Sequence, residues 1–273
     1  NILITGGAGY IGSHVIEKLI KRKKKVFIVD NLSSGYKKLI NKKAKFYKSD
    51  INHLKIIKKI IKKNKIDAVI HLAASISVTD SKKDYKLFYK NNVEGTSNLI
   101  KACKNSLVKN FVFSSTAAVY KSSNKKVTEL SKIKPKSVYG ITKLKAEKII
   151  IKSLKKLKIN YAILRYFNVV GASPSKKIGP LKKNDTLFKN ISTAMLKKKT
   201  DIKIYGNNFN TKDGTCIRDY IHVSDLSEIH IQILKKIEEA KKSVILNCGY
   251  GKGVSVKQVA DEFIKISKKE VSV

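Results

Sequence analysis

The stretch Gly6-Gly7-Ala8-Gly9-Tyr10-Ile11-Gly12 decides the fold of this chain of 273 residues. It directly follows an apolar run, residues 2–5, and opens a segment whose apolar residues recur at helical spacing. Gly6 allows a tight turn, Gly9 lets a pyrophosphate approach the backbone, and Gly12 allows the helix to pack closely. Because the helix begins at this turn, its N-terminus faces the anion. The stretch therefore predicts a dinucleotide-binding unit of strand, glycine loop and helix.

Beyond this unit, apolar runs rich in β-branched and aromatic residues alternate with longer helical patterns. Such alternation predicts an α/β fold, a Rossmann-like doubly wound parallel sheet built from right-handed crossovers. The expected strands cover residues 2–5, 26–30, 45–47, 68–72, 111–114 and 161–165, and the expected helices cover 11–21, 53–63, 87–103 and 138–157. After Gly171 the pattern loosens, with one helix expected at 187–197. We predict a dinucleotide-binding domain at 1–170 and a smaller C-terminal substrate-binding lobe at 171–273, truncated at its end.

An acidic residue, Asp30, ends the second expected strand. At this place in the fold a carboxylate accepts hydrogen bonds from the adenosine ribose and repels a 2′-phosphate. The sequence therefore predicts NAD as the cofactor, in preference to NADP.

Tyr139 and Lys143 lie four residues apart in the last expected helix of the first domain, so they share one helical face. A phenol with a pKa near 10 is a poor base at neutral pH, and lowering that pKa to about 7 requires roughly 4 kcal/mol of stabilisation of the phenolate. A neighbouring ammonium and a nicotinium ring can supply it. The pair also follows a strand that ends in Ser114-Ser115-Thr116. We predict that Tyr139 and Lys143 form a catalytic pair.

The net charge of +39 is carried almost entirely by lysine, because only Arg22, Arg165 and Arg218 are arginines among 59 basic residues. Recognition of phosphates and base edges favours the bidentate guanidinium fork of arginine. The lysines are scattered along nearly every segment, which indicates a compositional bias. We therefore expect no specific nucleic-acid partner.

The remaining composition indicates a cytoplasmic location. No apolar run approaches the roughly 18 residues that a membrane span needs, so we expect no membrane partner. The chain enters its first strand at once, which leaves no room for a secretory leader. Cys103, Cys216 and Cys248 lack the spacing of a disulfide framework or a zinc site, and the five histidines lack metal-ligand spacing. We expect free thiols and no metal.

Taken together, these motifs resemble the extended short-chain dehydrogenase/reductase family, and within it the UDP-glucose 4-epimerases. The resemblance runs along the whole chain and includes four further stretches, His71-Leu72-Ala73-Ala74, Asn91-Asn92-Val93-Glu94-Gly95-Thr96, Leu164-Arg165-Tyr166-Phe167-Asn168-Val169-Val170-Gly171 and residues 213–223. It implies an enzyme that interconverts UDP-glucose and UDP-galactose through a transient 4-keto sugar. It also implies a homodimer formed through the helices at 87–103 and 138–157.

The same resemblance assigns roles to individual residues. Thr116 joins Tyr139 and Lys143 as a catalytic residue by hydrogen-bonding the sugar 4-oxygen, in place of the family's usual Ser. Asn168 is expected to bind the substrate, Tyr205 to lie beside the uracil, and Arg218 to bind the diphosphate. The residues expected to line the NAD site are Gly6, Gly9, Tyr10, Ile11, Gly12, Asp30, Asn31, Asp50, Ile51, Leu72, Ala73, Asn91, Tyr139, Lys143 and Phe167.

Some features depart from the family and leave alternatives open. Ile76 replaces a Lys often found near the nicotinamide, and the stretch Asn184-Asp185-Thr186-Leu187 differs from the usual substrate loop. The segment that gates the sugar in relatives would follow Val273, so UDP-N-acetylglucosamine and UDP-glucuronate remain alternative substrates. A dehydratase or decarboxylase is disfavoured because Ala117 and Ala118 stand where elimination needs carboxylates. A non-catalytic polyanion-binding protein is disfavoured by the intact catalytic residues.

Overall fold

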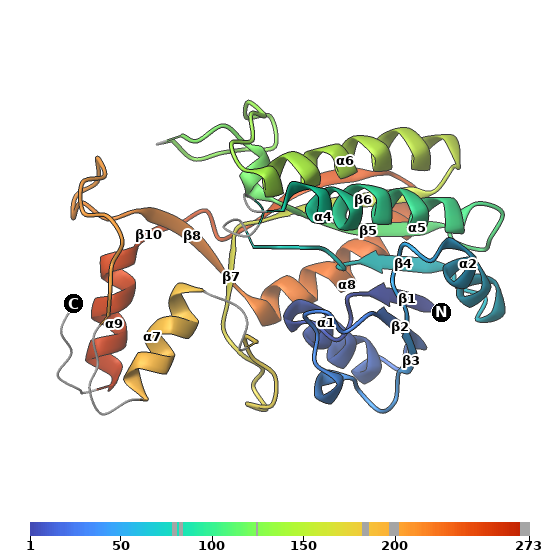
Figure 1. Cartoon of the computed structure of the whole chain (residues 1–273), viewed down its shortest axis with the longest axis horizontal. Helices are drawn as coiled ribbons and strands as arrows, with labels where there is room; N and C mark the ends of the chain where they lie inside the picture. The colour runs from blue at the N-terminus through green and yellow to red at the C-terminus, as the bar shows by residue number, and fades with distance from the viewer. Residues whose placement is uncertain (78–80, 82–83, 124, 182–185, 197–201, 268–273) are drawn as a thin grey trace.

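A central sheet of seven parallel strands, in the order β3-β2-β1-β4-β5-β6-β9, organises the computed structural model of the chain (Figure 1). The structure describes residues 1–77, 81, 84–123, 125–181, 186–196 and 202–267. The strands of the sheet are β1 (Ile2–Thr5), β2 (Val26–Asp30), β3 (Lys45–Lys48), β4 (Ala68–His71), β5 (Asn110–Thr116), β6 (Asn160–Tyr166) and β9 (Val244–Cys248). The six predicted strands are confirmed, with ends shifted by one or two residues. The strand order reverses at β1, where a doubly wound sheet opens a crevice beyond the carboxyl ends of its strands.

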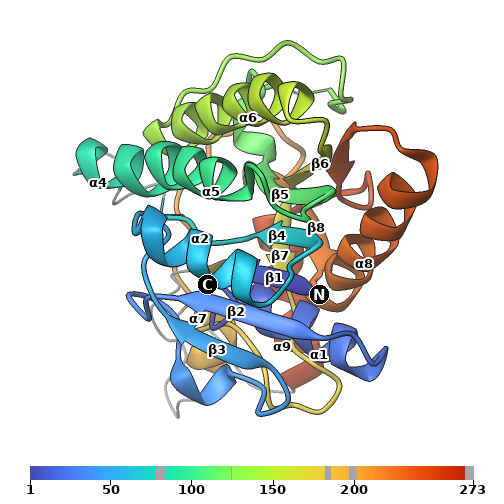
Figure 2. The same ribbon diagram turned by 90° about the vertical axis from the view of Figure 1, so that its right-hand side faces the viewer.

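Helices cover both faces of this sheet (Figure 2). One face carries α2 (Leu54–Lys63), α4 (Tyr85–Tyr89), α5 (Gly95–Cys103) and α6 (Val138–Lys156), and the other carries α1 (Tyr10–Lys21) and α8 (Val223–Ala240). The apolar stripe of α2 shows why these segments form surface helices, because its Ile57, Ile60 and Ile61 are buried while its lysines face outward. The helix predicted at 87–103 is divided by a π-helical turn, Lys90–Glu94, between α4 and α5. The short 3-10 turns η1 (Lys37–Leu39) and η3 (Ala117–Val119) complete this part.

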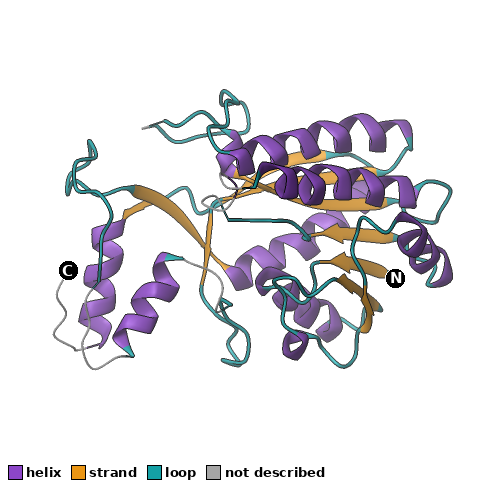
Figure 3. Ribbon diagram, in the orientation of Figure 1, coloured by secondary structure: helices purple, strands orange, loops and turns teal. Residues whose placement is uncertain are grey.

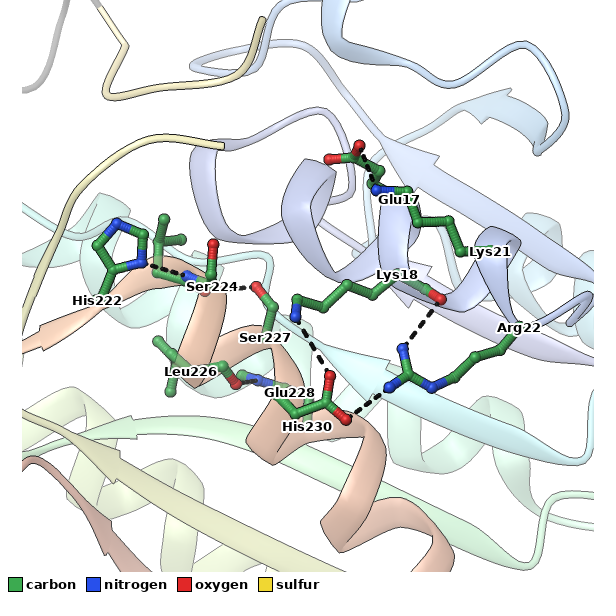
Figure 4. Close-up of polar contacts among 11 residues, drawn as sticks. Glu17, Lys18, Lys21, Arg22, His222, Ser224, Leu226, Ser227, Glu228 and His230 are labelled. Carbon is green, nitrogen blue, oxygen red and sulfur yellow. Dashed lines mark hydrogen bonds and ion pairs between the residues drawn. The ribbon is translucent and has the colours of Figure 1, made fainter. Parts of the chain in front are cut away.

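The helix α8 and the strand β9 return to the central sheet from the range that the sequence pattern assigns to the second lobe. Strand β9 pairs with β6 along five residues, and α8 packs against α1. Figure 4 shows Lys18 of α1 and Arg22, which caps the C-terminus of α1, both reaching Glu228 of α8, at 3.2 and 2.7 Å. The division at residue 171 stays a prediction, with the correction that residues 223–248 pack on the central sheet.

A smaller group of elements lies beyond the carboxyl end of the sheet (Figure 3). It contains a three-stranded sheet, β10 (Gly253–Ser255), β8 (Ile217–His222) and β7 (Asn168–Val170), and two helices, α7 (Leu187–Met195) and α9 (Val256–Ser267). Its own core joins Ile191 and Met195 of α7 to Val259 and Ala260 of α9. The predicted helix at 187–197 is confirmed up to Met195, and residue 197 lies outside the described residues. Among the described helices none is long and apolar enough to cross a membrane.

Candidate active site

The glycine loop between β1 and α1 is packed so closely against backbone atoms that side chains at Gly6 and Gly12 would not fit. Gly6 has φ +73°, and a Cβ there would lie 2.7 Å from the Ala73 nitrogen. A Cβ on Gly12 would lie 2.4 Å from the Gly6 carbonyl oxygen. The helix begins at Gly9, which offers no side-chain cap, so the first amides of α1 have no partner within the helix. This arrangement favours an anion at the N-terminus of α1.

Two of the predicted cofactor residues, Tyr10 and Ile11, form the first turn of α1 and are partly buried. The Tyr10 hydroxyl donates to the Gly171 carbonyl oxygen, which ties α1 to the residue that follows β7. Gly9 has only one close neighbour for an added Cβ, the Gly6 carbonyl oxygen at 3.1 Å. The loop is therefore held from both ends while its middle stays open.

The Asp30 carboxylate lies at the end of β2 and orders the loops on both sides of it. It accepts from the Ala8 amide at 3.0 Å and from the Leu32 amide at 2.8 Å. Burial raises the pKa of Asp30, and these two hydrogen bonds oppose the increase. Each carboxylate oxygen keeps a second lone pair, so Asp30 can still accept from a ribose hydroxyl.

Asn31 and Asp50 meet beside Asp30, because β2 and β3 are neighbours in the sheet. The Asn31 amide donates to the Asp50 carboxylate at 2.8 Å, and the Asn52 backbone amide donates to it at 2.8 Å. Burial raises the pKa of Asp50, but these hydrogen bonds outweigh it and leave that pKa below its ordinary value. Ile51 is buried directly after this pair. The structure thus brings these predicted cofactor residues together at one edge of the crevice.

The end of β4 carries a buried imidazole whose role the sequence does not reveal. His71 Nδ1 lies 2.7 Å from the Thr5 hydroxyl, and its Nε2 lies 2.9 Å from the Thr96 hydroxyl. Burial, with help from the charge of Lys143, lowers the pKa of His71 to about 3. The neutral ring holds Thr5, whose hydroxyl accepts from the Ala73 amide at 3.3 Å. His71 therefore positions the loop that faces Gly6.

The loop after β4 is also held by the π-helical turn. The Asn91 amide donates to the Ser75 hydroxyl at 2.8 Å, and the buried Asn92 amide donates to Thr142 of α6 at 3.1 Å. Leu72 is partly buried, and Ile76 is 57% exposed. The part of Asn91 in lining the NAD site stays a prediction, and the contribution of Asn92 had no signal beyond its place in a family motif. Short π-helical turns inside α-helices are frequent at functional sites.

Tyr139 begins the first turn of α6, where Ser137 caps the helix. Its phenol hydrogen-bonds with the buried Thr116 hydroxyl at the end of β5, so these two predicted residues do meet. Burial raises the pKa of Tyr139 to about 12, and the hydrogen bond with Thr116 opposes the increase. A further nearby positive charge is needed before this phenol can serve as a base at neutral pH.

Lys143 lies one helical turn after Tyr139 and is 2% exposed. Its Nζ donates to the Ser114 carbonyl oxygen at 2.6 Å and lies 4.7 Å from the centre of the Phe113 ring. Burial lowers the pKa of Lys143 to about 7, and the negative charge of Glu147 opposes the decrease. Phe167, the last predicted cofactor residue, directly follows β6 and donates its amide to the Cys248 carbonyl oxygen at 3.1 Å.

A cavity of about 280 Å³ lies between β7, β8 and the start of α7. Asn168 and Tyr220 line it, as do Thr186, which the sequence analysis noted as part of an unusual stretch, and Phe188, which no motif had singled out. Thr186 belongs to the stretch 184–187, whose Asn184 and Asp185 lie outside the described residues. Arg218 is exposed on β8, and the Tyr205 side chain is 87% exposed and does not line the cavity. The structure therefore brings Asn168 to a cavity, whereas Tyr205 lies on the surface.

No group of three or more His, Cys, Asp or Glu side chains in the described part of the chain could hold a metal ion.

An open helix N-terminus at a glycine loop on one face of the sheet, with a Tyr and a Lys on a helix of the other face, is typical of dinucleotide-dependent enzymes of the short-chain dehydrogenase/reductase type. Within that class, the chain belongs to the NAD dependent epimerase/dehydratase family, whose sequence model matches residues 2–249. The family resemblance predicted from the motifs is confirmed.

Individual relatives agree with this assignment. The chain is 40% identical over 268 residues to the UDP-glucose 4-epimerase of Lactobacillus helveticus, covering 97% of this chain and 81% of the relative. Its structure is similar to that of UDP-glucose 4-epimerase from Brucella ovis in complex with NAD, with a TM-score of 0.91, 33% identity, and coverage of 97% and 82%. It is also similar to the UDP-Glc/GlcNAc 4-epimerase from Campylobacter jejuni, with a TM-score of 0.84, 37% identity, and coverage of 99% and 86%.

Proposed function

We propose that the chain is an NAD-dependent UDP-sugar 4-epimerase that interconverts UDP-glucose and UDP-galactose. The observation that carries the proposal is the position of the Tyr139 phenol, which is hydrogen-bonded to Thr116 and one helical turn from Lys143. A phenol that is hydrogen-bonded to a hydroxyl and lies one helical turn from an ammonium can remove a proton from a sugar hydroxyl and return it. The relatives named as UDP-glucose 4-epimerases support the same reaction.

The residues around the glycine loop fit NAD. The α1 N-terminus suits the pyrophosphate, and the Asp30 carboxylate suits the adenosine ribose while it disfavours the 2′-phosphate of NADP. The adenine side would be held by Asn31, Asp50 and Ile51, and the nicotinamide side by Leu72, Ala73, Asn91, Phe167, Tyr139 and Lys143. When bound, NAD would supply a hydride acceptor and donor for the sugar C4.

The catalytic cycle follows from the positions of these side chains. The Tyr139 phenolate takes the proton of the 4-hydroxyl while the C4–H bond breaks, so that a C4=O bond forms. Thr116 hydrogen-bonds the reacting oxygen, and the Lys143 ammonium stabilises the phenolate. The 4-keto sugar then turns about its link to the diphosphate and presents its opposite face. Tyr139 returns the proton as hydride returns to C4, which inverts the alcohol with no net oxidation.

The substrate would lie between this group and the second sheet. Asn168 lines the cavity beside Tyr220, and the Arg218 guanidinium suits a diphosphate because it can donate two parallel hydrogen bonds. Tyr205 is the proposed neighbour of the uracil. Elimination of water is disfavoured, because Ala117 and Ala118 in η3 offer no carboxylate beside the sugar. The similarity to a UDP-Glc/GlcNAc 4-epimerase makes UDP-N-acetylglucosamine the second candidate substrate.

We also propose that the chain works as a cytoplasmic homodimer. Tyr85 and Leu87 of α4 are 44% and 46% exposed, and Lys145 of α6 lies 5.0 Å from the ring centre of Tyr89. Apolar side chains exposed on α4, next to α6, suit a helix-to-helix interface. All three cysteines are free, which suits a reducing compartment.

The proposal is tested on the purified full-length protein. Denaturing it and assaying the supernatant should release NAD at close to one molecule per chain, because a cycle that regenerates its cofactor gains nothing by releasing it. Incubation with UDP-galactose should give UDP-glucose, and parallel reactions with UDP-N-acetylglucosamine and UDP-glucuronate measure the preference. Release of NADP, or no conversion of any of the three sugars, would contradict the proposal.

A further inference from the structure

The catalytic face of α6 continues for one more turn beyond Lys143. Tyr139, Lys143 and Glu147 follow one another at steps of four residues, so their side chains lie in one row along the helix. Glu147 is 1% exposed and Lys143 is 2% exposed. A carboxylate and an ammonium are both costly to bury, so the partners of Glu147 decide what it can do.

The Glu147 carboxylate is held from β5 and β6. Arg165 of β6 donates to it twice, from Nε at 3.1 Å and from Nη2 at 2.7 Å. The Ser115 hydroxyl of β5 makes a short hydrogen bond to the same carboxylate. Arg165 is also tied on its far side, because its Nη1 donates to the Tyr120 hydroxyl at 2.9 Å. The carboxylate therefore cannot turn away from its place under α6.

Three consecutive residues at the end of β5 each meet one residue of the α6 row. Ser114 accepts from Lys143, Ser115 binds Glu147, and Thr116 binds Tyr139. Lys143 and Tyr139 each contact one residue at this strand end. Glu147 contacts Ser115 there and is also held by the bidentate pair with Arg165. Glu147 thus fixes the rotation of α6 on the sheet and, with it, the positions of the other two side chains.

Titratable side chains on three elements, β4, α6 and β6, have to be considered around Lys143. His71 of β4 is neutral, and Tyr139 of α6 and Tyr166 of β6 are uncharged phenols whose pKa burial raises. Arg165 is positive and pairs with both oxygens of the Glu147 carboxylate. Among the described residues, Glu147 is the carboxylate whose negative charge acts on the Lys143 ammonium.

We propose that Glu147, held by Arg165 and Ser115, is a positioning residue that fixes Lys143 one helical turn from Tyr139 and favours the charged form of the Lys143 ammonium. Only the expected effect on turnover rests on the proposed function; the effects on the position and charge of Lys143 do not. Without the carboxylate, burial acts on the ammonium with less opposition, and Lys143 loses its proton at lower pH. The phenolate of Tyr139 then loses the positive charge that stabilises it.

The test removes the whole ion pair, because Glu147→Gln alone would leave the Arg165 charge buried without a partner and could unfold the protein. In the double variant Glu147→Gln/Arg165→Met, the new amide oxygen can still accept from Ser115. The matched control is Arg22→Met/Glu228→Gln, which removes an Arg–Glu pair between α1 and α8. Each background is made with and without Lys143→Met, and all samples contain saturating NAD.

The first readout is the free energy of unfolding against pH, which does not require epimerase activity. Because burial holds the pKa of folded Lys143 below its unfolded value, the unfolded chain binds more protons above that pKa, and the Lys143 contribution rises with pH. Subtracting the Lys143→Met curve isolates this contribution. In Glu147→Gln/Arg165→Met, the Lys143 contribution to the free energy of unfolding should begin to rise about one pH unit lower than in the wild type. This shift is expected for the loss of a nearby opposite charge. In the Arg22→Met/Glu228→Gln background its onset should match the wild type.

The second readout is epimerisation against pH. The pH above which kcat declines should fall by the same amount in Glu147→Gln/Arg165→Met, while KM stays near the wild-type value. A decline in kcat that is equal at all pH values, or an onset of the stability curve that does not move, overturns the role of Glu147. If the wild-type protein epimerises no UDP-sugar, the proposed function fails, while the stability curves still decide the position and charge of Lys143.

Discussion

Gly12 and Gly6 are in direct backbone contact across the turn that opens α1, because a Cβ on Gly12 would lie 2.4 Å from the Gly6 carbonyl oxygen. The same Cβ would lie 2.8 Å from the Cα of Gly7. Both neighbours are backbone atoms, which cannot move aside as a flexible side chain can. The distance between the glycine loop and the first turn of α1 is therefore set by the missing side chain of Gly12.

The first prediction follows from this contact. Gly12→Ala should displace the loop, lower the free energy of unfolding by about 1–3 kcal/mol, and reduce the amount of NAD that co-purifies. Gly179→Ala is the matched control, because a Cβ there would meet only the Ala172 side chain, at 3.6 Å. Thermal unfolding and NAD release measured on both variants check it. Full NAD content in Gly12→Ala would show that the loop tolerates the extra atom.

A second prediction concerns the buried imidazoles of His71 and His230. Burial lowers the pKa of His71 to about 3 and that of His230 to about 4. Below the ordinary pKa of about 6.5 both imidazoles are protonated in the unfolded chain but stay neutral in the folded protein. The free energy of unfolding should therefore fall as the pH falls from about 6.5 to about 4. Denaturation curves measured across this range check the slope, and ¹⁵N spectra of the imidazoles at pH 5 should show two neutral rings.

Local patterns predicted the central sheet and the cofactor loop well. Strands such as β2 and β4 are short apolar runs between helical patterns, and the glycine spacing after β1 has one common structural meaning. The elements α8 and β9 were not foreseen, because their return to the sheet depends on pairing between β6 and β9, which are far apart in the sequence. An amphipathic pattern at 223–240 could have revealed α8 itself.

The candidate site shows the same boundary between local and distant information. Tyr139 and Lys143 were predictable because their spacing places them on one helical face. Glu147 continues that spacing, but nothing local identifies Arg165 as its partner, since that contact joins a helix to a strand. The hydrogen bonds of His71 likewise join three separate segments. Contacts of this kind depend on the assembled fold, so they appear only in the structure.

The third prediction concerns Thr116, whose hydroxyl also accepts from the Ala118 amide at 3.1 Å. Thr116→Val should lower turnover roughly 30 to 1,000-fold, because a hydrogen bond in the transition state is worth about 2–4 kcal/mol. Thr116→Ser keeps the hydroxyl and should retain most of the activity. Epimerisation rates and thermal unfolding of both variants separate catalysis from the loss of the Ala118 contact. Equal rates in the two variants would mean that Thr116 serves only in packing.

The fourth prediction compares Tyr139→Phe with Lys143→Met. Tyr139→Phe deletes one oxygen and leaves the ring, so turnover should fall by about 10² to 10⁴-fold while NAD content stays near the wild-type level. Lys143→Met leaves the phenol in place but removes the positive charge that stabilises the phenolate, so the pKa of Tyr139 should rise further. Raising the pH should then restore part of the activity of Lys143→Met, because a larger share of Tyr139 is ionised. The Tyr139→Phe variant has no proton to lose and should stay inactive at every pH.

Epimerisation rates measured against pH for both variants provide the test, with NAD content as the control for an intact cofactor site. Substantial turnover in Tyr139→Phe, or the same pH profile in both variants, would mean that a group other than Tyr139 removes the proton.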